Sequence, residues 1–524
     1  MKFSISALFC LLAVSPALGQ TFRNPVLWND LADNDVFRVN DTFYYSASTM
    51  HYSPGAPILQ SKDLVNWEYI GHSVPTLDWG SKYDLANGTN AYVKGIWAST
   101  LRYRESNGLF YWIGCVEFST TYIFTAPSIT GPWTQSSSID NCYYDAGMLI
   151  DDDDTMYVAH GGGTISVSQL SPDGLSEVST QVVFTSPSDV GYIEGSRMYK
   201  YNGSYYIFNT RPADAQFVLK STNGPFGPYV VKELLADIEG PIVGGGVPHQ
   251  GSLVDTQKGD WYYMAFEDSY PGGRMPVLAP ITWGSDGFPI LITVNGSWGT
   301  SYEYPLPPFP VPDLNGTDLF KETKLGPQWE WNHNPDVTKF SVGNGLKLET
   351  VTVTDDIYEA RNTLTHRILG PTSSGTILLD YKKMVDGDRA GLALFRDVSA
   401  WIGIVNSGSD FKVSFWNGMT LNSSTWTTSS PGSEIASVPI TNGTGKIWLR
   451  AFVDVQPGQV DTGLFFYSTD GVGYTQLGSF TLNNDWEFFM GYRYAIFNFA
   501  VIELGGSVEV DSFSLDAPGL TTTG

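Results

Sequence analysis

Five side chains that could do chemistry stand 11 to 14 positions ahead of a recurring tyrosine. They are Asp33, Trp97, Asp145, Glu194 and His249, which precede Tyr44, Tyr111, Tyr157, Tyr206 and Tyr262 respectively. Two carboxyl groups that flank a glycosidic bond can hydrolyse it, because a protonated one protonates the leaving oxygen while an ionised one attacks the sugar or activates water. A third carboxylate nearby would raise the pKa of the acid. This set of residues therefore predicts a site for glycosidic bond cleavage.

The surroundings of two of these carboxylates favour a functional role. Asp145 follows two tyrosines, and Glu194 follows Tyr192 and Ile193. An unpaired carboxylate in such an apolar stretch is costly, and a functional site is a common reason for it. A single residue such as Asp33 would fit an ordinary strand end or turn, and Trp97 or His249 alone would equally fit a core. The matched positions in all five repeats favour a shared site.

The repeated tyrosine indicates the elements that must position this site. Each copy has a turn residue followed by an aromatic residue inside an apolar run, and successive tyrosines are 67, 46, 49 and 56 residues apart. Periods of this size with several short strands are typical of a β-propeller. We predict five blades over residues 20–303. Because the first strand of each blade lines the central axis, the five residues should meet at one mouth of the channel.

The rest of the chain predicts a second all-β unit. A Pro-rich segment, 304–313, reads as an extended linker. Alternating strands follow at 375–381, 390–395 and 446–452, separated by Gly, Ser and Asn turns. This pattern predicts a β-sandwich over 314–518, with a short tail at 519–524. The fold class is thus all-β, a five-bladed β-propeller followed by a β-sandwich.

The first residues and the cysteines predict an extracellular protein. Residues 1–19 have one early lysine, a short apolar run and a small-residue cleavage site, as in a secretory signal peptide. In the secreted protein Cys115 and Cys142 would remain, either paired or free. Asn-x-Ser/Thr sequons, which would carry glycans in a eukaryotic secreted protein, occur at Asn40, Asn87, Asn202, Asn295, Asn315, Asn422 and Asn442.

The charge balance restricts the partners. With 29 basic and 54 acidic residues, the net charge is -25. Nucleic acids and anionic membranes would be repelled, whereas a neutral polysaccharide would not. Arg274, in the run Pro-Gly-Gly-Arg-Met-Pro at 271–276, offers donors to sugar hydroxyls. With the apolar ring of Trp97 and with His249, it completes the predicted substrate-binding set.

The segments that carry these residues resemble glycoside hydrolase family 43. The similar segments, in order through all five blades, are 24–26 (Asn-Pro-Val), 32–39 (Ala-Asp-Asn-Asp-Val-Phe-Arg-Val), 95–98 (Gly-Ile-Trp-Ala), 144–153, 193–200 and 249–254. The resemblance implies inverting hydrolysis of arabinose- or xylose-based glycans, with Asp33 as general base, Asp145 as pKa modulator and Glu194 as general acid. Asn34 stands where the family usually has proline, which leaves Asp35 as the alternative base.

Residues 329–335 and 361–367 resemble the concanavalin-A-like (jelly-roll) domain that follows the propeller in many members. Residues 31–35 and 48–57, together with this sandwich, look most like fungal arabinofuranosidases that debranch arabinoxylan. We therefore predict an α-L-arabinofuranosidase acting on plant cell-wall arabinoxylan or arabinan. The alternatives are a β-xylosidase acting on xylo-oligosaccharides and, from another class, a non-catalytic carbohydrate-binding propeller.

The sequence predicts no cofactor that the mechanism requires. The resemblance leaves open a calcium ion beside His249, since some family members hold an ion near that position. The four consecutive acids at 151–154 read either as oxygen ligands for calcium or, more ordinarily, as a solvated hairpin turn.

Overall fold

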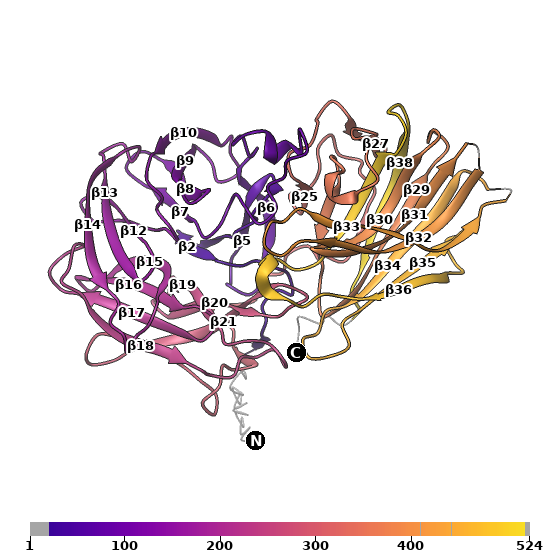
Figure 1. Cartoon of the computed structure of the whole chain (residues 1–524). Coiled ribbons are helices and arrows are strands. Elements are labelled where there is room, and N and C mark those ends of the chain that lie inside the picture. The colour runs from indigo at the N-terminus through magenta and orange to yellow at the C-terminus, as the bar shows by residue number, and fades with distance from the viewer. Residues whose placement is uncertain (1–19, 409, 442, 519–524) are drawn as a thin grey trace, which may run out of the picture.

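The computed structural model describes residues 20–408, 410–441 and 443–518. The predicted signal segment 1–19, the sequon at Asn442 and the tail 519–524 lie outside the described residues. The chain forms two β lobes side by side, the first indigo to pink and the second orange to yellow in Figure 1. Helical structure in the described ranges is limited to three 3-10 turns, η1 (Ser81–Asp84), η2 (Ile357–Glu359) and η3 (Trp486–Phe488). No helix in these ranges has the length and apolar character that crossing a membrane would require.

The first lobe is a five-bladed β-propeller, as predicted. Each blade is an antiparallel sheet of four strands. The blades are β2 (Asp35–Val39), β3 (Thr42–Ser46), β5 (Gly55–Ser61) and β6 (Glu68–Val74); β7 (Thr100–Arg104), β8 (Leu109–Val116), β9 (Thr120–Ala126) and β10 (Thr134–Ile139); β11 (Gly147–Ile150), β12 (Met156–His160), β13 (Thr164–Leu170) and β14 (Glu177–Thr185); β15 (Glu194–Tyr201), β16 (Ser204–Arg211), β17 (Ala215–Ser221) and β18 (Val230–Ala236); and β19 (His249–Asp255), β20 (Trp261–Asp268), β21 (Arg274–Trp283) and β22 (Pro289–Leu291).

Local turn chemistry explains why the repeated tyrosines all fall on the second strand of a blade. At the hairpin between β15 and β16, Asn202 and Gly203 both adopt positive φ angles, 47° and 74°. Tight two-residue hairpins need such angles at both positions, and Asn-Gly supplies them at little cost. The strand after this turn then carries Tyr206, which pairs with Tyr199 across the ladder.

The first strand of each blade lines the axis. β2, β7, β11, β15 and β19 each contact the corresponding strand of the next blade, and β19 contacts β2 to close the ring. The ends of the propeller are joined by β1 (Thr21–Arg23), which pairs with β23 (Ser301–Glu303). This closure holds the five inner strands around one channel.

The second lobe is a sandwich of two eight-stranded antiparallel sheets. Buried and partly exposed residues alternate strictly along β34, as expected for a strand with one face in the core. One sheet comprises β24 (Gly316–Asp318), β26 (Phe340–Val342), β27 (Leu346–Glu349), β29 (Thr372–Asp380), β34 (Lys446–Asp454), β35 (Thr462–Ser468), β36 (Thr475–Thr481) and β38 (Ser507–Asp516); the other comprises β25 (Trp329–Asn332), β28 (Leu364–Arg367), β30 (Asp388–Phe395), β31 (Val398–Ser407), β32 (Asp410–Leu421), β33 (Thr428–Pro439), β37 (Arg493–Ala500) and the propeller strand β4 (Tyr52–Ser53).

The two lobes share structure at their joint. β4 leaves the propeller and pairs with β25 at the edge of a sandwich sheet. Beside it, the fully buried carboxylate of Glu330 contacts Arg367 at 2.9 Å, Arg493 at 2.6 Å and the ring of His72 at 3.0 Å. Burial favours the neutral acid, but the two guanidinium groups outweigh it and hold the pKa of Glu330 well below its usual range.

The Pro-rich segment 304–313 is packed rather than free. Leu306 is buried in the propeller core. The backbone N–H of Phe309 donates to Asp63 Oδ2 at 2.7 Å. The segment is therefore fastened to the first blade and does not act as an independent spacer between the lobes.

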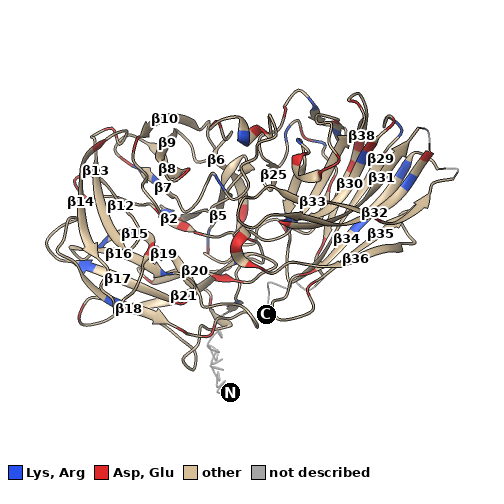
Figure 2. Cartoon of the chain, viewed as in Figure 1, with Lys and Arg blue, Asp and Glu red and all other residues tan. Residues whose placement is uncertain are grey.

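Other features singled out in the sequence can also be located. Cys115 and Cys142 form a disulfide. Residues 151–154 lie in the turn between β11 and β12, where Asp151 pairs with Lys200 and Asp154 pairs with Arg104 at 2.5 Å. The four acids therefore form a hairpin turn whose carboxylates pair with basic side chains, as the second of the two interpretations expects. Acidic side chains are spread over both lobes (Figure 2).

Candidate active site

The five residues singled out in the sequence all lie at one end of the inner strands. Glu194 and His249 are the first residues of β15 and β19. Asp33, Trp97 and Asp145 lie two or three residues ahead of β2, β7 and β11 respectively. Because these strands form a closed ring, the five positions surround one mouth of the channel. The ring of blades is visible in the left lobe of Figure 1.

The structure separates the two candidate bases in the first blade. Asp33 is buried and accepts a hydrogen bond from Arg274 Nη1 at 2.9 Å. Asp35 is completely buried, and its Oδ2 accepts from Arg102 at 2.6 Å and from Thr100 at 2.7 Å. Burial acts to raise the pKa of Asp35, but Arg102 and Arg197 outweigh it and lower the pKa. Asp35 is thus an ion-pair partner inside the propeller, which favours Asp33 as the base.

Asp33 and Asp145 are held in a strained backbone conformation. Their φ angles are 55° and 52°, in the left-handed region that non-glycine residues seldom adopt. Residues held in this region recur at active sites as well as in turns. At both positions this conformation turns the chain just before an inner strand begins.

Asp145 and Glu194 form an electrostatic pair. Asp145 Oδ2 accepts a hydrogen bond from the backbone N–H of Gly195 at 2.9 Å. Burial, followed by the charges of Glu194 and Asp33, raises the pKa of Asp145 well above its usual value. Burial and the charge of Asp33 also raise the pKa of Glu194. Like charges in one buried site favour retention of a proton, so the site is suited to hold a carboxylic acid.

One guanidinium group ties the three carboxylate segments together. Arg197, on β15 and completely buried, donates through Nη2 to Asp33 O at 2.7 Å and through Nη1 to Ala146 O at 2.9 Å. Its Nε donates to Asn34 O at 3.1 Å. Arg197 therefore fixes the backbones that carry Asp33 and Asp145 relative to the strand that carries Glu194. The sequence analysis did not single it out, because an arginine inside a strand gives no signal of these long-range bonds.

A row of aromatic rings runs from Glu194 toward the sandwich. Tyr144 donates from its hydroxyl to Glu194 Oε2 at 2.8 Å. Its ring lies 6.0 Å from that of Phe118, which lies 5.7 Å from Trp97. Trp97 in turn meets Phe489 of the sandwich at 4.8 Å. Phe118 is 61% exposed, so this row offers apolar ring faces at the rim of the mouth.

Arg274 and His249 take up different positions around the mouth. Arg274 is buried against Asp33, and its Nε and Nη2 have no hydrogen-bond partner within the described part of the chain. Both atoms are themselves buried, so the assignment of Arg274 to substrate binding stays a prediction. His249 is buried, with Nδ1 2.8 Å from Val247 O and its ring packed 4.6 Å from Phe266. Within residues 20–408, 410–441 and 443–518, no group of three His, Cys, Asp or Glu side chains is arranged to hold a metal ion.

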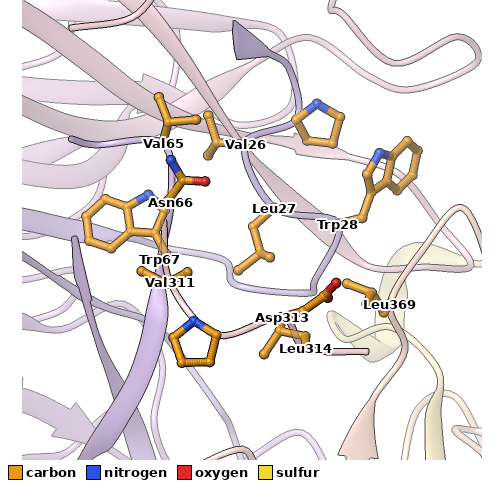
Figure 3. Close-up of a pocket in the computed structure, with 12 residues that line it drawn as sticks. Val26, Leu27, Trp28, Val65, Asn66, Trp67, Val311, Asp313, Leu314 and Leu369 are labelled. Atoms are coloured by element: carbon orange, nitrogen blue, oxygen red, sulfur yellow. The ribbon is translucent and has the colours of Figure 1, made fainter. Parts of the chain in front are cut away.

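A separate apolar cavity lies between the first blade and the linker. It has a volume of about 160 Å³ and is lined by Leu27, Trp28, Val65, Trp67 and Leu314, among others. Figure 3 shows these side chains around the cavity. Asp33, Asp145 and Glu194 are not among its lining residues, so this cavity belongs to the packing of the joint.

Both lobes match known protein families. Residues 22–289 match the model for glycosyl hydrolases family 43. The chain belongs to glycoside hydrolase family 43. Residues 317–516 match the β-xylosidase C-terminal concanavalin A-like domain. The predicted resemblance and the all-β fold of propeller plus concanavalin-A-like sandwich are thus confirmed, and the protein is a glycosidase rather than a non-catalytic propeller.

Individual relatives span from about three quarters to nearly all of the chain. A solved family 43 glycoside hydrolase, engineered at its active site to display both endo-xylanase and exo-arabinofuranosidase activity, is 49% identical, with a TM-score of 0.92, over 95% of this chain and 99% of that one. A β-xylosidase of Formosa agariphila is 28% identical over 95% of this chain and 91% of its own. A non-reducing end α-L-arabinofuranosidase of Bacteroides ovatus is 26% identical over 72% of this chain and 74% of its own.

Proposed function

We propose that this glycosidase is a secreted, inverting α-L-arabinofuranosidase that removes arabinose side chains from arabinoxylan. The observation that carries the proposal is the meeting of Asp33, Asp145 and Glu194, from three blades, at one channel mouth. The similarity to the engineered enzyme with exo-arabinofuranosidase activity supports the choice of sugar. The net charge of -25 is compatible with a neutral glycan.

In the proposed mechanism each carboxylate has one task. Glu194, with its raised pKa, donates a proton to the oxygen that leaves with the xylan backbone. Asp33, which pairs with Arg274 at 2.9 Å, removes a proton from the water that attacks the anomeric carbon. Asp145 shares the buried site with Glu194, and repulsion between the two carboxylates favours retention of one proton by the pair. The glycosidic C–O bond breaks as the water oxygen bonds from the opposite face, which inverts the anomeric configuration.

A β-xylosidase is the second candidate. The relative from Formosa agariphila, which spans nearly the whole chain, favours it. Pentose rings of the two kinds differ by little in such a pocket, and differences of this size discriminate weakly. We expect the wild-type protein to act faster on an aryl α-L-arabinofuranoside than on an aryl β-D-xyloside, and to release arabinose from arabinoxylan. The opposite ratio would make it a β-xylosidase, and activity on none of the three would refute both.

Glu194→Gln tests the acid. On substrates with poor leaving groups we expect kcat to fall at least a hundredfold, because proton donation contributes about 10² to 10⁴ in rate. An activated aryl leaving group departs without full protonation, so kcat on such a substrate should fall less. Equal losses on both kinds of substrate would contradict the role. Nuclear magnetic resonance of the first product anomer tests inversion.

Secretion is proposed on three features. These are the signal-like segment 1–19, the disulfide between Cys115 and Cys142, and sequons with exposed asparagines such as Asn87 and Asn202. Disulfides persist mainly in oxidising compartments. Protein recovered from the culture medium should begin near Gln20, and a chain that retains residues 1–19 inside the cell would contradict this.

A further inference from the structure

The loop between β36 and β37 brings a sandwich residue to the propeller mouth. Its helical turn η3 lies between the two lobes in Figure 1. Phe489 follows this turn with a φ of 60° and packs against Trp97. The guanidinium carbon of Arg274 lies 5.9 Å from the Phe489 ring. Phe489 thus contacts two residues that we assign to substrate binding, although its own position is set by the sandwich.

A single buried arginine holds the ends of this loop. Arg396, which directly follows β30 and is completely buried, donates from Nε to Met490 O at 2.7 Å and from Nη1 to Asn483 O at 3.0 Å. Its Nη2 donates to Asp485 O. These three carbonyl groups lie on both sides of η3 and Phe489. The guanidinium group therefore joins the two ends of the loop, which wraps around it.

The charge and orientation of Arg396 are also specified. Asp397 Oδ1 accepts from Arg396 Nη1 at 2.8 Å. The other oxygen of Asp397 accepts from Asn483 Nδ2 at 2.7 Å. The ring of Phe488 lies 5.5 Å from the guanidinium carbon. A lysine could neutralise Asp397, but a single ammonium group cannot reproduce a planar fork that reaches three carbonyls.

The far end of the loop is aligned with the segment of Arg274. Asp30 accepts from the backbone N–H of Arg274 at 2.8 Å and from that of Gly491 at 2.9 Å, one through each carboxylate oxygen. A Cβ at position 491 would lie 1.9 Å from Gly272 O, so only glycine fits there. The loop therefore packs against the Arg274 segment of the propeller in one defined position.

We propose that Arg396 is a positioning residue for substrate binding, because its three carbonyl bonds hold Phe489 against Trp97 and Arg274. This inference rests on the proposed function of the same mouth. Phe489 contacts neither Asp33 nor Glu194 in the bonds described above, so its position should affect the binding of the sugar more than the proton transfers. The expected signature is a change in KM with little change in kcat.

The test compares Arg396→Lys, Phe489→Ala and the double variant, using whichever aryl glycoside the wild type hydrolyses. We expect each single change to raise KM about tenfold, the effect of losing one aromatic contact, with kcat within about threefold. The double variant should be no worse than Phe489→Ala, because Arg396 acts through Phe489. The matched control is Arg450→Lys, a sandwich arginine that lies over Tyr474 instead and should leave KM unchanged.

A second measurement is independent of activity. Hydrogen exchange of the backbone amides in 483–491 should rise in Arg396→Lys and stay at the wild-type rate in Arg450→Lys. Additive KM effects, or unchanged exchange in the loop, would overturn the proposal. If Arg396→Lys does not fold, Asn483→Ala, which removes the link to Asp397, takes its place with the same expectations. A wild type that is inactive on both aryl glycosides refutes the proposed function. The exchange result still tests whether Arg396 holds the loop in place.

Discussion

The hydroxyl of Tyr144 should set the upper pH limit of activity. It donates to Glu194 Oε2 at 2.8 Å, which stabilises the ionised carboxylate and acts to lower the pKa of Glu194. A hydrogen bond to a charged group contributes about 1.5–3 kcal/mol. Because Glu194 is partly exposed, we discount this to about 1 kcal/mol. Because the ionised carboxylate loses this stabilisation in Tyr144→Phe, the substitution should raise the pKa of Glu194.

The assay is the pH profile of kcat/KM, which reports the free enzyme. A general acid must be protonated, so a higher pKa moves the alkaline limb to higher pH, while the acidic limb stays in place. The control is Tyr143→Phe, because the hydroxyl of Tyr143 donates to Glu177 at 2.6 Å and not to Glu194. This substitution should leave both limbs unchanged. An alkaline limb that stays fixed or moves to lower pH in Tyr144→Phe would refute the reasoning.

Three further predictions concern the other carboxylates. Asp33→Asn should abolish turnover while leaving sugar binding, measured by calorimetry, largely intact; loss of turnover through the equivalent change at Asp35, with normal folding, would move the base there. Asp145→Asn should shift the alkaline limb to lower pH, since it removes a like charge beside Glu194; an unshifted limb would count against a modulator role. Glu330→Gln should lower stability by about 3–5 kcal/mol in denaturant unfolding, because Arg367 and Arg493 lose their buried partner; a change below about 1 kcal/mol would contradict this.

The same buried carboxylate predicts how stability depends on pH. The pKa of folded Glu330 is lowered, so its contribution is present above the unfolded value of about 4.3 and is lost as the pH falls through the folded value. Wild type should therefore lose stability in acid more steeply than Glu330→Gln. Parallel acid dependences of the two proteins would exclude this contribution.

The sequence by itself was sufficient to predict the propeller and the positions that face its channel. Turn residues such as Asn202 and Gly203 act locally, and the strands that follow them alternate inward and outward, so a repeat in the chain becomes a repeat in space. Asp145 and Glu194 could be found because each interrupts an apolar stretch at the same place in its repeat.

Other features depended on contacts between distant segments, which no local pattern records. Asp33 and Asp35 are two residues apart and look alike in the sequence, yet one faces Arg274 and the other is buried against Arg102. Phe489 stands in a sandwich loop and reaches Trp97 only because Arg396 and Asp30 hold that loop against the propeller. Local propensity determines which strands form, whereas the closure of the ring and the docking of the sandwich determine which side chains meet.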